Sequence, residues 1–71
     1  MSAYAVIIEG NEGSFSAYVP DLPGCVATGQ SLEDVEARIR EAITAHIESL
    51  EEHGETVPPP TTAAVKFVDV A

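Results

Sequence analysis

The chain has 71 residues, with twelve acidic side chains against three basic ones and a formal net charge of −9. This length accommodates one domain, residues 1–71, and a surface so acidic repels phosphate backbones, which argues against direct nucleic-acid binding. The single cysteine, Cys25, excludes an internal disulfide and a cysteine-based metal site. Residues 1–4 carry no basic region, and no apolar run approaches the ~20 residues that span a bilayer. We therefore expect a cytoplasmic protein.

A domain this small buries a limited core. About 60% of the surface that the unfolded chain exposes becomes buried at this size. Disulfides, metals or oligomers usually compensate, and the first two are excluded or unsupported here. The sequence thus predicts self-association into a dimer or tetramer.

The first half of the chain predicts three strands. Residues 3–9 (AYAVIIE) are β-branched and aromatic, and residues 14–19 (SFSAYV) alternate apolar and polar side chains. Between them, residues 10–13 (GNEG) tolerate positive φ and predict a hairpin turn. Residues 20–24 (PDLPG) predict a second turn, and residues 25–28 (CVAT) a short third strand.

An amphipathic helix follows. Ser31 and Asp34 have capping-box spacing, with aspartate in the usual place of glutamate. Behind them a stripe of apolar side chains recurs at steps of three and four as far as Leu50, and Gly54 ends the helix at His53. At about 33 Å this helix should be longer than the ~20 Å strands and overhang the sheet at one end.

A fourth strand is predicted after the helix. Residues 58–60 (PPP) exclude helix, and residues 63–70 (AAVKFVDV) are again strand-like. The order βββαβ indicates an α+β fold: an antiparallel meander, one helix on one sheet face, and a last strand beside the first, in spatial order 3-2-1-4. The two open sheet edges favour pairing with another chain.

The sequence offers little chemistry. His46 and His53 lie seven residues apart, whereas a metal pair on a helix requires a spacing of four. Cys25 enters a strand far from both and is interpreted as a small buried hydrophobe. The helix acids lie mostly outside the apolar stripe and indicate a solvated face. We expect no catalytic residue, no metal and no cofactor, so the protein is not predicted to be an enzyme.

Three acids are unusual in their position. Glu48, Glu51 and Glu52 crowd the end of the helix, where the dipole disfavours negative charge by about 0.3–1 kcal/mol each. Stability alone would favour lysine there. These acids are therefore candidate contacts for a basic partner, although the overall charge by itself is more typical of a solubility device.

The middle of the chain resembles the HicB-like antitoxin family. The resemblance lies in residues 18–25 (YVPDLPGC), then Thr28-Gly29, residues 31–34 (SLED), and the helix that leads to residues 50–54 (LEEHG) and to the proline triplet. It covers residues 14–60. It implies the βββαβ arrangement, often described as a degraded RNase H-like core. Full-length members usually continue into a DNA-binding module, whereas this chain stops at Ala71.

The resemblance also implies a partner. Family members neutralise a small basic toxin of the HicA type, an RNase, and an acidic protein could cover its RNA-binding surface. The candidate partner-binding residues are those of the rigid turn and of the acidic helix end: Asp21, Leu22, Pro23, Gly24, Glu48, Glu51 and Glu52. The alternative is that the turn only connects two strands. Two alternatives stay open, an orphan homo-oligomeric domain without a toxin and a residual RNase H-like nuclease that would require Mg²⁺.

Overall fold

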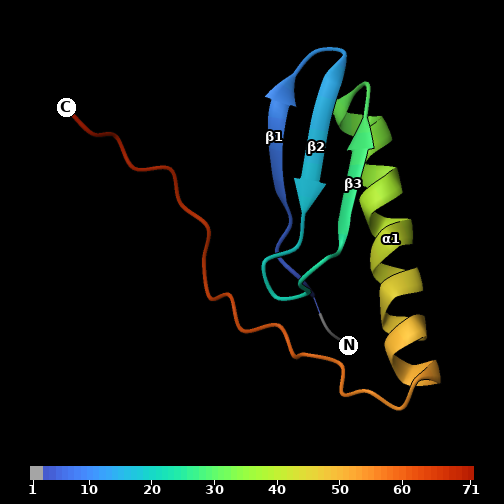
Figure 1. Ribbon diagram of the computed structural model, residues 1–71. Coiled ribbons are helices and arrows are strands. Elements are labelled where there is room, and N and C mark those ends of the chain that lie inside the picture. Colours follow the sequence, from blue (N-terminus) through green and yellow to red (C-terminus); the bar gives the residue numbers. More distant parts are fainter. Residues whose placement is uncertain (1–2) are drawn as a thin grey trace.

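The structure, a computed structural model, describes residues 3–71. It contains strands β1 (Ile7–Asn11), β2 (Ser14–Tyr18) and β3 (Val26–Gly29), followed by helix α1 (Leu32–Glu52). The strands form one antiparallel sheet in the order β1-β2-β3, and α1 covers one face of it (Figure 1). The helix packs mainly against β2 and β3, and β1 lies at the edge of the sheet. The predicted α+β class and the meander are confirmed.

The first hairpin is displaced from its predicted position. β1 begins at Ile7 rather than residue 3, because its partner β2 pairs Tyr18 with Ile7 and ends before Pro20, which has no N–H for the ladder. At the other end Gly10 and Asn11 belong to the ladder, so Glu12 and Gly13 alone form the turn. Gly10 is required there, because a Cβ would lie 2.2 Å from the Ser14 carbonyl oxygen.

The core lies between the sheet and the helix. Its buried side chains come from the helix-facing side of β2, the connecting loop and the first half of α1: Ala17, Val19, Leu22, Cys25, Val35 and Ile39. β3 approaches the helix closely at Gly29, where a Cβ would lie 2.7 Å from the Val35 nitrogen. The glycine therefore sets the distance between sheet and helix.

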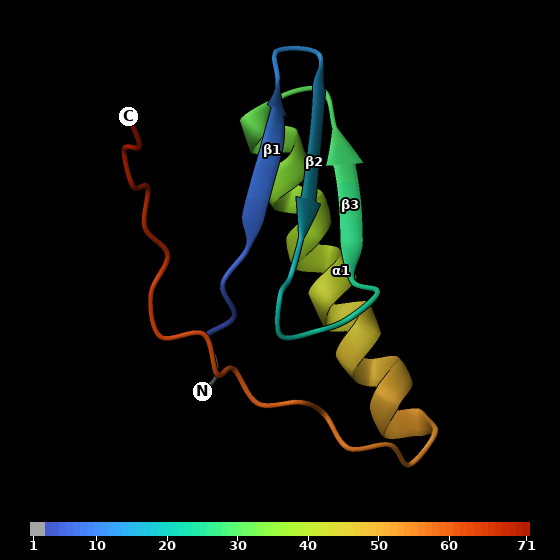
Figure 2. The ribbon, with the colours of Figure 1, turned by 60° about the vertical axis from the view of Figure 1, so that its left-hand side comes forward.

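Helix α1 is closed at both ends as predicted. The Ser31 side chain accepts from the Asp34 N–H at 3.1 Å, and the Asp34 carboxylate accepts from the Gln30 N–H at 3.0 Å. At the other end the Glu55 N–H donates to the Leu50 carbonyl and the Gly54 N–H to the Glu51 carbonyl, a Schellman motif with Gly54 at φ 69°. The helix extends past the sheet (Figure 2), which confirms the expected overhang.

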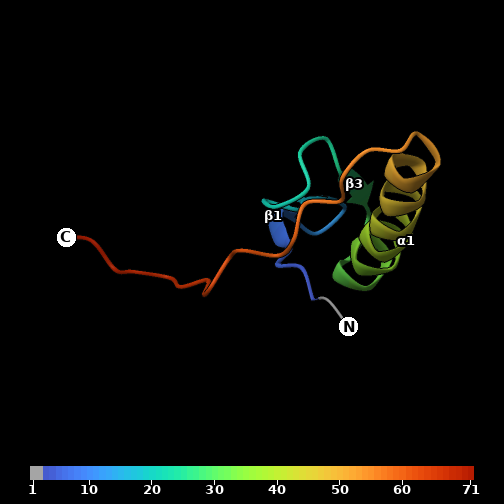
Figure 3. The ribbon, with the colours of Figure 1, turned by 90° about the horizontal axis from the view of Figure 1, so that it is seen from below.

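The predicted fourth strand is not present. Residues 63–70 form no strand, every residue from 61 to 71 is exposed, and the sheet has three strands in place of the order 3-2-1-4. The physical reason is that no neighbouring backbone supplies a hydrogen-bond ladder, because the segment runs away from the body on the β1 side (Figures 1 and 3). The RNase H-like relation stays a prediction.

Candidate partner-binding surface

The turn between β2 and β3 is built around a buried leucine. Leu22 is fully buried, its N–H donates to the Val19 carbonyl at 3.1 Å, and its carbonyl accepts from the Cys25 N–H at 3.1 Å. Gly24 supplies a positive φ of 86°. Of the four residues predicted to contact a partner here, Pro23 and Gly24 are exposed, whereas the Leu22 side chain belongs to the core.

Asp21 holds the segment that follows the helix. Its carboxylate accepts hydrogen bonds from the Thr61 N–H, the Thr61 hydroxyl and the Thr62 N–H, each at 3.0 Å. These donors, the Thr62 N–H foremost, lower the pKa of Asp21 below its ordinary 3.8. The Tyr4 hydroxyl donates to the Pro58 carbonyl nearby. Sequence reasoning missed these contacts, since they join residues about 40 and 54 positions apart and no local pattern marks them.

The acidic helix end is exposed, as predicted. Glu48, Glu51 and Glu52 all face solvent, and the last turn carries no lysine or arginine. The β2–β3 turn lies at this same end of the molecule, and residues 55–62 run from the end of the helix past this turn (Figures 1 and 2). The two sets of candidate residues therefore share one end of the domain.

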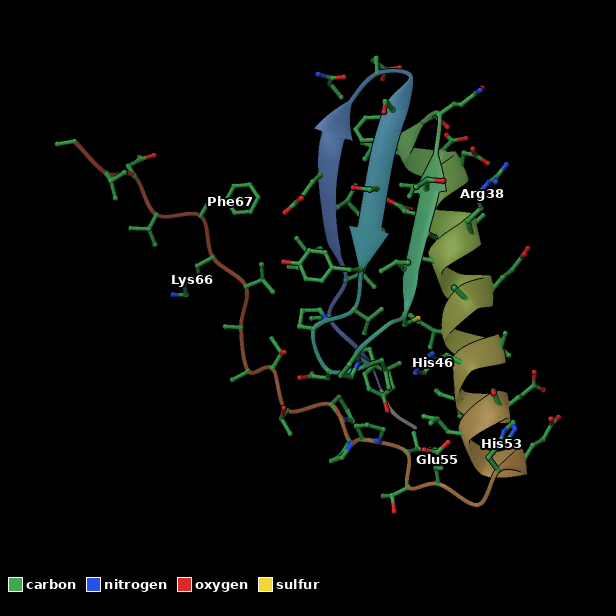
Figure 4. The ribbon with its side chains drawn as sticks, viewed as in Figure 1. Arg38, His46, His53, Glu55, Lys66 and Phe67 are labelled. Carbon is green, nitrogen blue, oxygen red and sulfur yellow. The ribbon has the colours of Figure 1, made fainter. Side chains whose placement is uncertain are left out.

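The histidines and the cysteine are held apart. His53 closes the helix, with its Nδ1 atom 2.7 Å from the Ser49 carbonyl oxygen, whereas His46 is half-buried two turns earlier (Figure 4). Cys25 is buried, and burial raises the pKa of its thiol. Within residues 3–71, no three histidine, cysteine or acidic side chains gather in a way that could hold a metal ion.

A groove opens beside β1. Its volume is about 370 Å³, and it lies between the segment that leads into β1 and the uncovered flank of α1. Its apolar lining consists of Tyr4, Val6, Ile8, Ile39 and Ile43. Ile8 pairs with the buried Ala17 across the ladder, so it faces the helix side of the sheet. The groove therefore continues the core outward past β1.

Comparison with known proteins identifies the family. The family model described as "HicB_like antitoxin of bacterial toxin-antitoxin system" matches residues 4–69. This covers nearly the whole chain, so the protein belongs to the HicB-like antitoxin family. The resemblance drawn from the sequence is confirmed.

Curated relatives are spread across archaea, bacteria and a phage. A UPF0150 protein of Thermoplasma acidophilum is 45% identical over 56 residues, which cover 78% of this chain and 81% of the relative. A UPF0150 protein of Helicobacter pylori is 42% identical over 63% of this chain and 62% of its own length. A 14.9 kDa protein from the rep-hol intergenic region of Haemophilus phage HP1 is 36% identical over 78% of this chain but only 41% of its own length. No solved structure was found to match significantly. In the part of the chain that the structure describes, no helix is long and apolar enough to cross a membrane.

Proposed function

We propose that this protein is an antitoxin that sequesters a small basic RNase of the HicA type by covering its RNA-binding surface, without catalysis of its own. Membership in the antitoxin family supports a toxin partner in general. The observation that points to a basic partner is the exposed acidic end of α1, where three glutamates stand against the helix dipole in a chain of net charge −9. A cytoplasmic location is part of this proposal.

The proposed contact combines charge with a rigid turn. The exposed Pro23 and Gly24 stand at the same end of the domain as the acids, on a loop that the buried Leu22 holds in place. A surface of this kind attracts a basic protein over long range. It also competes with RNA phosphates for the basic side chains of that protein.

The test is inhibition of a purified HicA-type RNase; a neighbouring reading frame that encodes a small basic chain would be the first candidate to supply it. The variant Glu48→Gln/Glu51→Gln/Glu52→Gln should weaken binding and inhibition, with the loss mainly in the association rate and largest at low salt. Its thermal stability should be equal or higher, because negative charge leaves the C-terminal end of the helix.

The matched control is Glu12→Gln/Glu33→Gln/Glu41→Gln, which removes the same charge from exposed positions elsewhere. If both triple variants bind equally well, the acidic helix end is not the contact. If the unaltered chain neither binds nor inhibits such an RNase, the orphan reading stands instead. Metal-dependent RNA cleavage by the purified chain would favour the nuclease reading.

A further inference from the structure

The exposed apolar residues of the chain are concentrated in one segment. Phe67 is 100% exposed, and Val68 and Val70 are 76% and 88% exposed. Residues 63–71, called the tail below, combine these side chains with strand-forming composition and with no partner. Such a segment is stable only when another backbone pairs with it and covers its apolar side.

The complementary surface is the outer side of β1. As the first strand of a three-stranded sheet it has one unpaired edge, and no helix or loop of the described chain covers that edge. The apolar groove formed by Tyr4, Val6, Ile8, Ile39 and Ile43 opens beside it. A strand added here would extend the sheet and place every second side chain over the groove.

The groove carries one charged side chain of each sign, so either facing of the added strand has a residue of opposite charge available. The groove is also lined by Glu36 and Arg40, both exposed. If Val65 and Phe67 face it, Asp69 lies on the same side, and Arg40 is the lining residue of opposite charge. If Val68 and Val70 face it, Lys66 lies on the same side, and Glu36 is the lining residue of opposite charge. Each facing thus offers two apolar side chains and one complementary charge.

Within one copy the tail and this edge remain apart. The bonds from Asp21 to Thr61 and Thr62, and from Tyr4 to Pro58, fix the point at which the chain leaves the body. From there the tail runs outward on the β1 side, away from α1, in all three ribbon views (Figures 1, 2 and 3). Figure 4 shows Phe67 and Lys66 well separated from the body. Each copy therefore presents one unpaired segment of strand-forming composition and one unpaired sheet edge.

We infer that two copies of this chain form a symmetric dimer by strand exchange, in which the tail of each copy pairs with β1 of the other and fills its groove. A two-fold arrangement satisfies both features at once, because the same two surfaces are used twice. Nine residues extend about 30 Å, which is enough to follow the five residues of β1 in a neighbouring molecule. The two Phe67 side chains alone would bury about 300–500 Å² of the ~1,600 Å² typical of a stable interface.

The first test is the mass of the purified chain alone, measured by sedimentation across a concentration series that reaches the millimolar range. The expected result is a species of twice the 7.5 kDa chain mass. Phe67→Asp should weaken the dimer by at least about thirtyfold, as loss of a central aromatic anchor does. Because Phe67 contacts nothing in the single copy, this variant keeps the fold, which circular dichroism verifies.

The matched control is Val26→Asp, an equally drastic change at an exposed apolar residue on the open face of the sheet. It should leave the dimer intact. A chain that is monomeric throughout, or a dimer lost in Val26→Asp and retained in Phe67→Asp, overturns the inference.

A cross-link distinguishes exchange from closure of the tail onto its own β1. In a Cys25→Ala background, one preparation carries Glu9→Cys and a second, of different mass tag, carries Val68→Cys. A bis-maleimide should link the two preparations after mixing. Exclusive linkage within a single chain that carries both substitutions, with no linkage between chains, overturns the exchange.

Discussion

The body of the domain, residues 4–54, and the tail, residues 63–71, have similar strand-forming composition but differ in how much of it is buried. Both have β-branched and aromatic residues in strand-like patterns, yet the body buries six apolar side chains between sheet and helix, whereas Phe67, Val68 and Val70 in the tail are almost fully exposed. The difference is the presence of a neighbouring backbone, which β1, β2 and β3 find in one another. A strand-like pattern therefore gives only a propensity, and pairing depends on a second backbone within reach.

The largest expected effect separates the two regions directly. Leu22→Ala removes a fully buried side chain from the body and should lower the free energy of unfolding by about 2–5 kcal/mol. Phe67→Ala removes a larger side chain from the tail and should cost less than about 0.5 kcal/mol in the monomer. Urea unfolding at high dilution compares them, and equal losses would refute the distinction.

A substitution at the contact between β3 and α1 should also destabilise the body of the domain. Gly29→Ala would place a Cβ 2.7 Å from the Val35 nitrogen and force sheet and helix apart, at a cost of about 1–3 kcal/mol. The neighbouring Thr28 is exposed, so Thr28→Ala should change the unfolding free energy by no more than about 0.5 kcal/mol. A tolerated Gly29→Ala would show that the sheet and helix are not closely packed at this point.

The start of the helix should give a smaller effect. Ser31→Ala removes the acceptor for the Asp34 N–H and should lower the unfolding free energy by about 1 kcal/mol, with the dimer unaffected. Thermal unfolding followed by circular dichroism measures it. An unchanged midpoint would mean that water replaces the cap without loss.

The smallest effect is expected at the junction between body and tail. The hydrogen bonds from Thr62 and Thr61 favour the ionised form of Asp21 and lower its pKa. The junction is therefore held together at any pH above 3.8, the ordinary pKa of an aspartate. As the pH falls through the lowered pKa, protonation should release Thr61 and Thr62 while the body stays folded.

Amide proton shifts of these threonines over acidic pH report the release, and Asp21→Ala should give the released shifts at neutral pH. Asp34 also has a lowered pKa, caused chiefly by the Gln30 N–H and by Arg38, and is followed separately through the Gln30 amide. If the threonine amide shifts change neither with pH nor in Asp21→Ala, the role of Asp21 in holding Thr61 and Thr62 is contradicted.

Local patterns predicted the local structure well. The Ser31 cap, the end of the helix at Gly54, the meander and the exposed acids all follow from residues close together in sequence. The boundaries of β1 could not be predicted, because they depend on where β2 stops. The bonds of Asp21 to residues 40 positions away and the burial of Leu22 depend on tertiary placement, so two residues assigned to a partner surface proved to have roles inside the fold. The prediction of a fourth strand was wrong for the same reason, because the sequence of a segment does not determine which backbone it pairs with.

Hydrogen exchange shows whether the tail forms a strand whose partner is β1 of a second copy. Amides of residues 64–70 and of β2 are compared across a concentration series. Protection of the tail should rise with concentration, together with that of the outer edge of β1, whereas protection of β2 should stay constant until global unfolding. A tail that exchanges freely at every concentration, or one protected equally at all of them, would contradict this pairing.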